Sequence, residues 1–174
     1  MLLRNYYNQL FSLFSEETIA NGLKQLDGTV VNSACPSNSD TANGIIQAIR
    51  GLNGVANDYA NRKFVLGSGN TPASVDDYKL ESIITTSLSG SVSKSVDDNG
   101  NLVIVISVTN NSSAPIIVGE VGISANCHSA SSTRVLCLVE RTVLDEPITL
   151  GAGESCFISY KVNFAPTVGS FPTA

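Results

Sequence analysis

Few residues of this chain have the types and spacing that catalysis or metal binding requires. His128 is the single histidine among the 174 residues, and it directly follows Cys127. A structural zinc site needs about four ligands at recognisable spacings, and neither a second histidine nor a Cys-x-x-Cys pair accompanies these two residues. We therefore predict that His128 lies in the solvated loop of a β-hairpin over residues 126–133, and that the chain binds no metal.

The carboxylates and glycines do not complete a catalytic or phosphate-binding motif either. Residues 97–100, Asp-Asp-Asn-Gly, lack the alternating ligands and the closing Glu of a calcium loop, and Asn-Gly favours a tight hairpin turn. Asp76, Asp77 and Glu81 have no defined geometry, so we expect a loop surface or a helix start there. Gly67 and Gly69 lack the rest of a nucleotide-binding fingerprint. From these patterns we predict that the chain has no catalytic residue, binds no cofactor and is not an enzyme.

Composition narrows the class of partner. Only 14% of residues are charged, the net charge is −5, and the ten Lys and Arg are scattered, which argues against a nucleic-acid partner. Arg4 interrupts the first apolar residues, and no run of about 20 apolar residues exists, so we expect neither a signal peptide nor a membrane span. The four cysteines, Cys35, Cys127, Cys137 and Cys156, are then predicted to be reduced, with Cys137 and Cys156 as buried thiols.

The second half of the chain alternates between apolar and polar residues, which is the period of a half-buried β-strand. The pattern is clearest in residues 102–109, 134–144 and 156–164, and turn residues separate these runs. We predict a mainly β fold, an antiparallel β-sandwich of the jelly-roll kind over residues 62–164. Its expected core is Leu102, Ile104, Ile106, Val108, Val121, Ile123, Val135, Val139, Ile158, Val162 and Phe164.

Two charges stand out against this pattern. Glu120 lies inside an apolar strand, where a charge must be paired, and Arg141 interrupts the apolar face of another strand. We predict that Arg141 is the partner of Glu120 and that this pair is structural.

The two ends of the chain differ from the β region. Apolar and aromatic residues recur every three or four positions over residues 3–14, which predicts a short amphipathic helix. Residues 41–52 are a weaker helix candidate, and residues 28–40 are expected to be loop. Pro166 and Pro172 keep residues 165–174 out of a central strand, so we expect an extended arm.

These differences predict three parts: a docking segment over residues 1–61, the β-sandwich over residues 62–164 and the arm over residues 165–174. Residues 1–15 and the arm would then contact other chains through Tyr7, Phe11, Phe14 and Phe171. The alternative is that the helix packs across a sheet of its own domain, and the sequence favours neither.

Three segments carry a resemblance to a known class of protein. Residues 64–81 combine a strand, a Gly-rich turn and a Thr-Pro loop that ends in Asp-x-x-Leu-Glu; residues 118–123 and 139–154 follow in similar order. This arrangement resembles small β-domain structural proteins of tailed bacteriophages, over about residues 62–164. The resemblance implies a virion protein that is assembled in the host cytoplasm, and it brings no catalytic residues.

Two functions remain open from the sequence. The first is a capsid decoration, collar, or tail or fibre adaptor protein that binds other virion proteins, with homo-oligomerisation expected. The chain has no heptad, collagen or glycine-rich shaft, so a compact role fits better than a whole fibre. The second is a module that binds a glycan or receptor on the host surface, although the chain has no Trp to serve as an aromatic platform.

Overall fold

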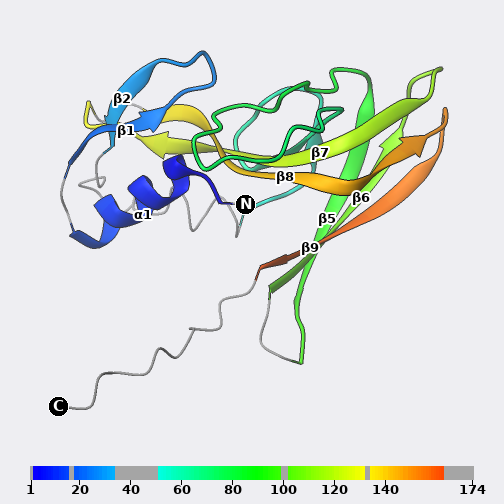
Figure 1. The fold of residues 1–174 in the computed structure, drawn as a ribbon. Coiled ribbons are helices and arrows are strands. Elements are labelled where there is room, and N and C mark those ends of the chain that lie inside the picture. The colour runs from blue at the N-terminus through cyan, green and yellow to red at the C-terminus, as the bar shows by residue number, and fades with distance from the viewer. Residues whose placement is uncertain (1, 16–17, 34–50, 99–101, 132–133, 163–174) are drawn as a thin grey trace.

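The computed structural model describes residues 2–15, 18–33, 51–98, 102–131 and 134–162 (Figure 1). These ranges contain the helix α1, Arg4–Ser15, and nine β-strands, which form three sheets. The prediction of a mainly β chain with a short N-terminal helix is confirmed. Within these ranges, no helix is long and apolar enough to span a lipid bilayer.

The larger sheet has four strands in the order β3-β4-β7-β8. β3 is Val55–Ala56, β4 is Lys63–Gly67, β7 is Ile116–His128 and β8 is Arg134–Leu150. The short β3 pairs with β4 in parallel, whereas the other neighbours are antiparallel. Nearly every residue of β7 is buried, because both faces of this sheet are covered.

A second sheet has three antiparallel strands in the order β5-β6-β9. β5 is Leu88–Val96, β6 is Leu102–Asn110 and β9 is Ser155–Val162. The predicted hairpin between β5 and β6 is confirmed by their pairing, although turn residues 99–101 lie outside the described ranges. In β6, buried and partly buried residues alternate, so this sheet has one covered face.

A two-stranded hairpin of β1, Ile19–Lys24, and β2, Val30–Ser33, follows α1. The prediction of a loop over residues 28–40 is therefore wrong for residues 30–33. The turn uses Gly28 at a φ of 88°, a conformation that favours glycine. The helix predicted over residues 41–52 lies outside the described ranges except for residues 51 and 52, which are not helical.

The hydrophobic core lies in two places, one on each face of the four-stranded sheet. The larger cluster includes Leu66 and Cys137 with Ile104 and Ile106 of the other sheet. The smaller cluster, on the opposite face, is Leu3, Val65, Leu80 and Leu138. Alternation along β4 and β8 explains the division, because adjacent residues point to opposite faces.

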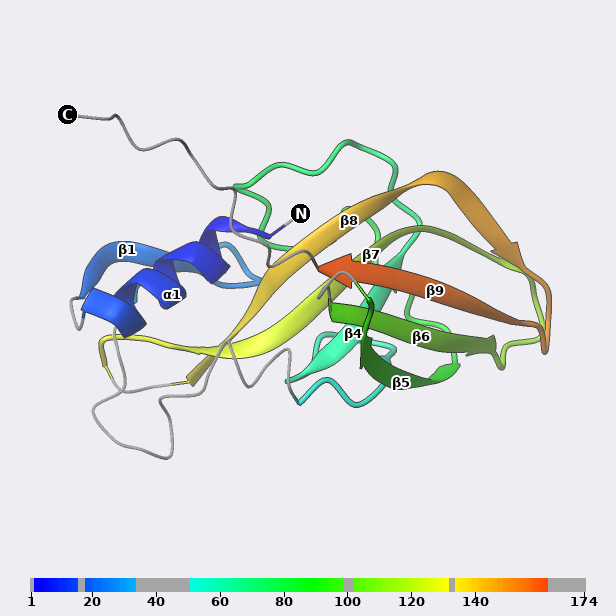
Figure 2. The ribbon, with the colours of Figure 1, turned by 90° about the horizontal axis from the view of Figure 1, so that it is seen from below.

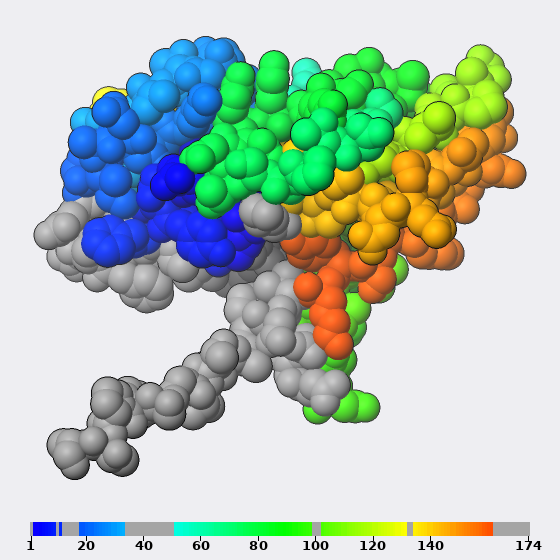
Figure 3. Space-filling view, viewed as in Figure 1, coloured from blue at the N-terminus to red at the C-terminus, as the bar shows by residue number. Residues whose placement is uncertain are grey.

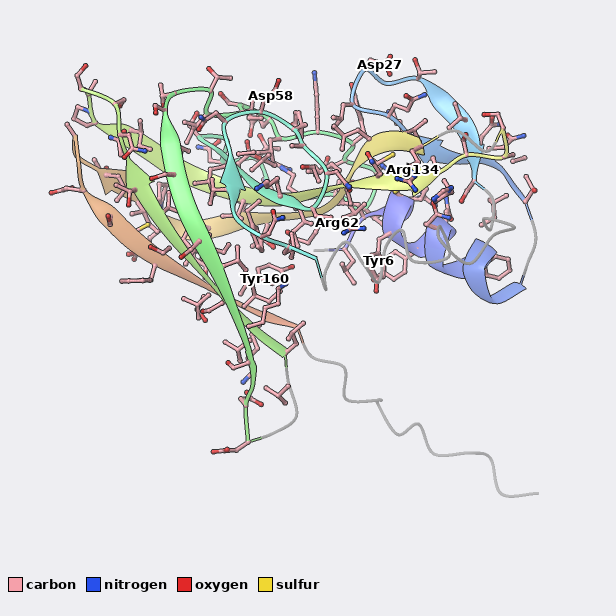
Figure 4. All side chains as sticks on the ribbon, turned by 180° about the vertical axis from the view of Figure 1, so that it is seen from behind. Tyr6, Asp27, Asp58, Arg62, Arg134 and Tyr160 are labelled. Atoms are coloured by element: carbon pink, nitrogen blue, oxygen red, sulfur yellow. The ribbon has the colours of Figure 1, made fainter. Side chains whose placement is uncertain are left out.

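Most of the predicted core is confirmed. The buried members are Ile104, Ile106, Val108, Val121, Ile123, Val139 and Ile158, and Leu102 and Val135 are partly buried. The side chains of Val162 and Phe164 lie outside what the structure describes. Tyr160 of β9, labelled in Figure 4, lies on the three-stranded sheet. Its side chain forms a hydrogen bond with Glu140 of β8, which ties this sheet to the four-stranded one.

α1 lies beside the β1–β2 hairpin at one end of the four-stranded sheet, and the three-stranded sheet lies toward the other end (Figures 1 and 2). The chain enters α1 along β8, since Leu2 forms a β-bridge with Glu140 and the Leu3 N–H donates to the Val139 carbonyl over 3.1 Å. One face of the helix therefore packs on its own domain, which was the alternative to docking on another chain.

Candidate docking surface

α1 has a buried face and an exposed face. Leu3 and Tyr6 are buried in the core, whereas Tyr7 is 52% exposed and Phe11 is 56% exposed. Tyr7 and Phe11 are four residues apart, so their side chains lie next to each other on the outer side of the helix. The Tyr6 and Tyr7 rings meet edge to face, with centroids 5.7 Å apart, and this contact links the two faces.

The predicted interface residues are therefore placed in part. Tyr7 and Phe11 are exposed, as a docking surface requires. The side chain of Phe14 and the whole of Phe171 lie outside what the structure describes. We use the term aromatic face of α1 for Tyr7 and Phe11.

Buried polar side chains fix the helix to the sheets. The Asn5 amide donates to the carbonyls of Lys24, over 2.8 Å, and Leu138, over 3.0 Å. Its oxygen accepts from the Lys24 N–H over 2.7 Å. Asn8 adds a bond to the Gly22 carbonyl over 2.8 Å. These bonds leave little freedom for the helix to rotate, so the aromatic face has a defined direction.

Gln9 anchors the next turn of the helix to the end of β7. Its side-chain oxygen accepts from the His128 backbone N–H over 2.6 Å. His128 is the last residue of β7 and is buried, so the prediction of a solvated loop residue is wrong. Burial lowers the pKa of His128, and the nearby Arg134 lowers it further. The hairpin itself is present, but its loop is shorter than predicted.

Asn5 and Gln9 were not predicted as anchors from the sequence. They are four residues apart, so they lie on the same side of the helix, among residues that become buried. Two amides at this spacing on an otherwise apolar face were the available signal. Each amide has donors and an acceptor, which suits it to backbone groups at the end of a sheet.

A second polar cluster, centred on Arg141, joins β7 and β8 of the four-stranded sheet to the loop before β5. The Arg141 Nε donates to Glu120 Oε2 over 2.7 Å, and both side chains are almost wholly buried. This confirms the predicted pair. Further contacts join Arg141 to Asp77 over 2.7 Å, to Glu81 over 3.7 Å and to the Thr71 carbonyl over 3.1 Å.

Asp77 and Glu81 therefore have a defined geometry, contrary to the prediction of a plain loop surface. Glu81 also accepts from the backbone N–H groups of Asn70 and Thr71, over 3.0 and 2.9 Å. The Thr71 bonds are the main reason why the pKa of Glu81 is lowered. Residues 70–81 thus curl around one guanidinium group.

Glu120 holds the same loop from the other side. Its carboxylate accepts from the backbone N–H groups of Gly69, Glu81 and Ser82, over 3.3, 3.2 and 2.9 Å. Gly67 makes this approach possible, because a Cβ there would lie 2.4 Å from Glu120 Oε1 and 2.7 Å from the Ser82 carbonyl oxygen. We call Glu120, Arg141, Asp77 and Glu81 the loop clamp. It fastens residues 68–82 to the outer face of the sheet.

The clamped loop in turn supports the end of the molecule that carries α1. Arg4 forms an exposed ion pair with Asp76, and the Lys24 ammonium lies 4.0 Å from the centre of the Tyr78 ring. Figure 3 shows the segment that contains α1 and the first hairpin against residues from this loop. Two pockets, of about 270 and 360 Å³, flank the loop and share Arg141 in their walls.

The cysteines do not add to either cluster. Cys127 and Cys137 are buried and Cys156 is partly buried, and none of these three forms a disulfide; Cys35 lies outside the described ranges. A hydrogen bond between the Cys127 and Cys137 thiols, together with burial, raises the pKa of Cys127. Across the described ranges, no three His, Cys, Asp or Glu residues gather in a way that could hold a metal ion.

No protein-family model, no curated protein and no solved structure matches this chain.

Proposed function

We propose that this protein is a non-enzymatic structural protein of a bacteriophage virion, which docks on other virion chains through the aromatic face of α1. It would serve as a capsid decoration, collar, or tail or fibre adaptor protein, and would carry no cofactor. The main support for the docking role is that Tyr7 and Phe11 are exposed on a helix whose opposite face is packed against the sheets.

Aromatic rings that are exposed to water cost free energy. Apolar area contributes about 25 cal/mol per Å² when it leaves water, so a helix that exposes two adjacent aromatic side chains gains free energy when a partner covers them. The bonds of Asn5 and Gln9 hold the helix in place before binding. Little conformational entropy is then lost on docking, which favours affinity.

The assignment to a phage particle is supported by the resemblance of residues 64–81, 118–123 and 139–154. In this structure those segments contain β4 with its clamped loop, the centre of β7 and most of β8. The loop clamp gives the Asp-x-x-Leu-Glu end of the first segment a physical role, since both acidic residues of that motif bind Arg141. Assembly in the host cytoplasm and a virion location are part of this proposal.

We further propose that the two main sheets form a β-sandwich. A jelly-roll-like β-sandwich made of the four-stranded and three-stranded sheets would provide a rigid mount for docking. The larger core cluster supports it, because that cluster joins residues of both sheets. The Tyr160 bond to Glu140 adds a polar tie between them.

A double substitution, Tyr7→Ser with Phe11→Ser, tests the docking role. Both side chains are about half exposed, so the variant should keep the thermal stability of the unchanged protein. We expect it to be missing from particles that are assembled in its presence, as measured by the protein content of purified virions.

Ile117→Ser is the matched control, since Ile117 is 54% exposed but lies on β7. It should be incorporated normally. Normal incorporation of the double variant, at normal stability, would contradict the proposal. Truncation of residues 1–15 is a poorer test, because it also removes the buried Leu3 and Tyr6.

One observation favours the second candidate, a module that binds a host-surface glycan or receptor. The pocket of about 270 Å³ is lined by Tyr78, Asp76 and Asp77. An aromatic ring with neighbouring carboxylates suits a sugar, which has an apolar face and a ring of hydroxyl groups. A glycan array would decide: binding that is lost in Tyr78→Ala would favour this function over docking.

A further inference from the structure

β9 is an unprotected edge of the three-stranded sheet. It pairs with β6 along its whole length in a regular register, and it has no other neighbour among the described strands. Edge strands of this kind are normally shielded by bulges, prolines or repeated charges, because their unpaired backbone groups can bind another strand. Within residues 155–162 there is one charged residue, Lys161, and no proline.

The alternation of hydrogen bonds shows which groups of β9 point outward. The Asn110 N–H donates to the Glu154 carbonyl over 2.9 Å, so residues 110 and 154 occupy the position of a hydrogen-bonded pair in the ladder, although the Glu154 N–H turns to the Gly151 carbonyl. In an antiparallel ladder such pairs alternate with non-bonded pairs. Cys156, Ile158 and Tyr160 therefore bond to β6. The backbone N–H and C=O groups of Ser155, Phe157, Ser159 and Lys161 point away from it.

Side chains agree with this assignment. The Thr109 and Ser155 hydroxyls are 2.7 Å apart, which fits the closer approach of side chains in a non-bonded pair. Phe157 is 75% exposed, the largest exposure among the large apolar side chains that the structure describes. An aromatic side chain thus stands in the middle of a row of outward backbone groups.

The other edge of the same sheet is different. On β5 the Leu88 N–H donates to the Asn57 side chain over 2.7 Å, and Gly54 lies against the Gly90 carbonyl. The loop before β4 therefore covers the beginning of that edge. On its outer side, β9 has no hydrogen-bonded neighbour among the described strands at any point along its length.

We propose that β9 pairs with β9 of a second copy of this chain, antiparallel and about a two-fold axis at Ile158. This goes beyond docking through α1, because it assigns a separate surface and a separate partner. The product is one continuous six-stranded sheet across a symmetric dimer, the arrangement that a self-complementary edge gives.

The register of this pairing follows from the backbone groups of β9 that are not bonded to β6. With Ile158 on the axis, Phe157 lies opposite Ser159 of the second copy, and Ser155 lies opposite Lys161 of the second copy. All four outward residues then exchange hydrogen bonds, and no like charges face each other. A shift by one residue would present the groups that already bind β6, and a shift by two residues would leave one end unpaired.

Side-chain contacts add to the backbone bonds. Ile158 meets its own copy at the axis on the covered face. The two Phe157 side chains occupy diagonal positions on the outer face, within reach of aromatic rings. The contact remains smaller than a standard protein interface, so the dimer is expected to dissociate on dilution.

Sedimentation velocity of the full chain over a range of concentrations tests the proposal, with Ser159→Pro and Ser159→Ala as a matched pair. Proline removes an N–H that points away from β6, so the ladder within the chain is kept. We expect Ser159→Ala to dimerise as the unchanged protein does. Ser159→Pro should raise the dimer dissociation constant by at least about tenfold, because the two-fold axis doubles each loss.

Amide hydrogen exchange of the unchanged protein provides a test that does not depend on a variant. The N–H groups of Phe157, Ser159 and Lys161 should become protected as the concentration rises, whereas that of Ile158 should be protected throughout. A protein that is monomeric at every concentration would overturn the proposal. So would a dimer in which these three amides still exchange freely, since another surface would then form it.

Discussion

The two main sheets differ in how many of their faces are covered. In the four-stranded sheet, adjacent residues such as Cys137 and Leu138 are both fully buried and belong to different core clusters. In the three-stranded sheet, Ile104 and Ile106 are fully buried, while Val105 between them is partly exposed. One sheet is thus an interior layer, and the other is the outer wall of the molecule.

This difference shows where each sheet can place polar and apolar residues. The interior sheet uses Glu120 and Arg141 to hold a loop, since a buried charge must find partners within the protein. The outer sheet carries Phe157 in water, where a ring gains from a partner on another molecule. Buried polar groups therefore organise the fold, and exposed apolar groups mark candidate contacts.

The strongest test of the interior sheet is Arg141→Ala. It would leave Glu120 buried without its cation, and we expect the free energy of unfolding to fall by about 3–5 kcal/mol in urea denaturation. Arg134→Ala, on the exposed start of the same strand, should change it by less than about 0.5 kcal/mol. Equal effects would mean that the loop clamp does not stabilise the fold.

Side-chain truncations on the two faces of each sheet test whether the sheets differ in how many faces are covered. Leu138→Ala and Ile104→Ala both create cavities in a core, and each should cost about 2–5 kcal/mol in the same measurement. Val105→Ala should cost less than about 1 kcal/mol, because its face of the sheet is open. An equal loss of stability for Val105→Ala and Ile104→Ala would show that the outer face of the three-stranded sheet is covered.

Asn5→Ala tests whether polar bonds fix the helix on the interior sheet. Three hydrogen bonds would be lost, two of them to Lys24 and one to Leu138, so we expect a loss of about 1–3 kcal/mol in thermal or urea unfolding. Asn8→Ala removes one partly buried bond and should cost less. A greater cost for Asn8 would contradict the assigned anchors.

We expect the smallest change in stability from the protonation of His128 at low pH. The pKa of His128 is lowered in the folded protein, mainly by burial, so below about pH 6.5 the unfolded chain takes up the proton more readily. Stability should therefore decline from pH 7 towards pH 5. His128→Asn should make that decline shallower, as measured by the urea midpoint at each pH. An identical pH dependence in the variant would show that other groups cause it.

Sequence patterns predicted those features that depend on short-range alternation. The period of two in residues 102–109 identified β6, and the isolated charges Glu120 and Arg141 were rightly paired, because few other partners suit a charge in an apolar strand. The β1–β2 hairpin was missed, since residues 28–40 are rich in turn-forming types and β2 is only four residues long.

The predictions for Asp77, Glu81 and His128 at the candidate site were wrong for a different reason. Asp77 and Glu81 gain their roles when their loop folds over the sheet, and no local pattern shows which face a loop will cover. His128 is buried at the end of β7, where its backbone N–H donates to Gln9, more than a hundred residues earlier in the chain. Contacts between such distant segments follow from the tertiary fold and have no local signature.

The bond between Asn5 and the Leu138 carbonyl also sets an order of events during synthesis. These residues are separated by 133 positions, so the helix leaves the ribosome long before its partner strand exists. At about 5–20 residues per second, translation takes on the order of ten seconds to reach that strand. Throughout that interval α1 can contact the β1–β2 hairpin, which follows it directly, but the Leu3 side chain has no four-stranded sheet to pack against, so the smaller core cluster forms only after residue 138 has been made.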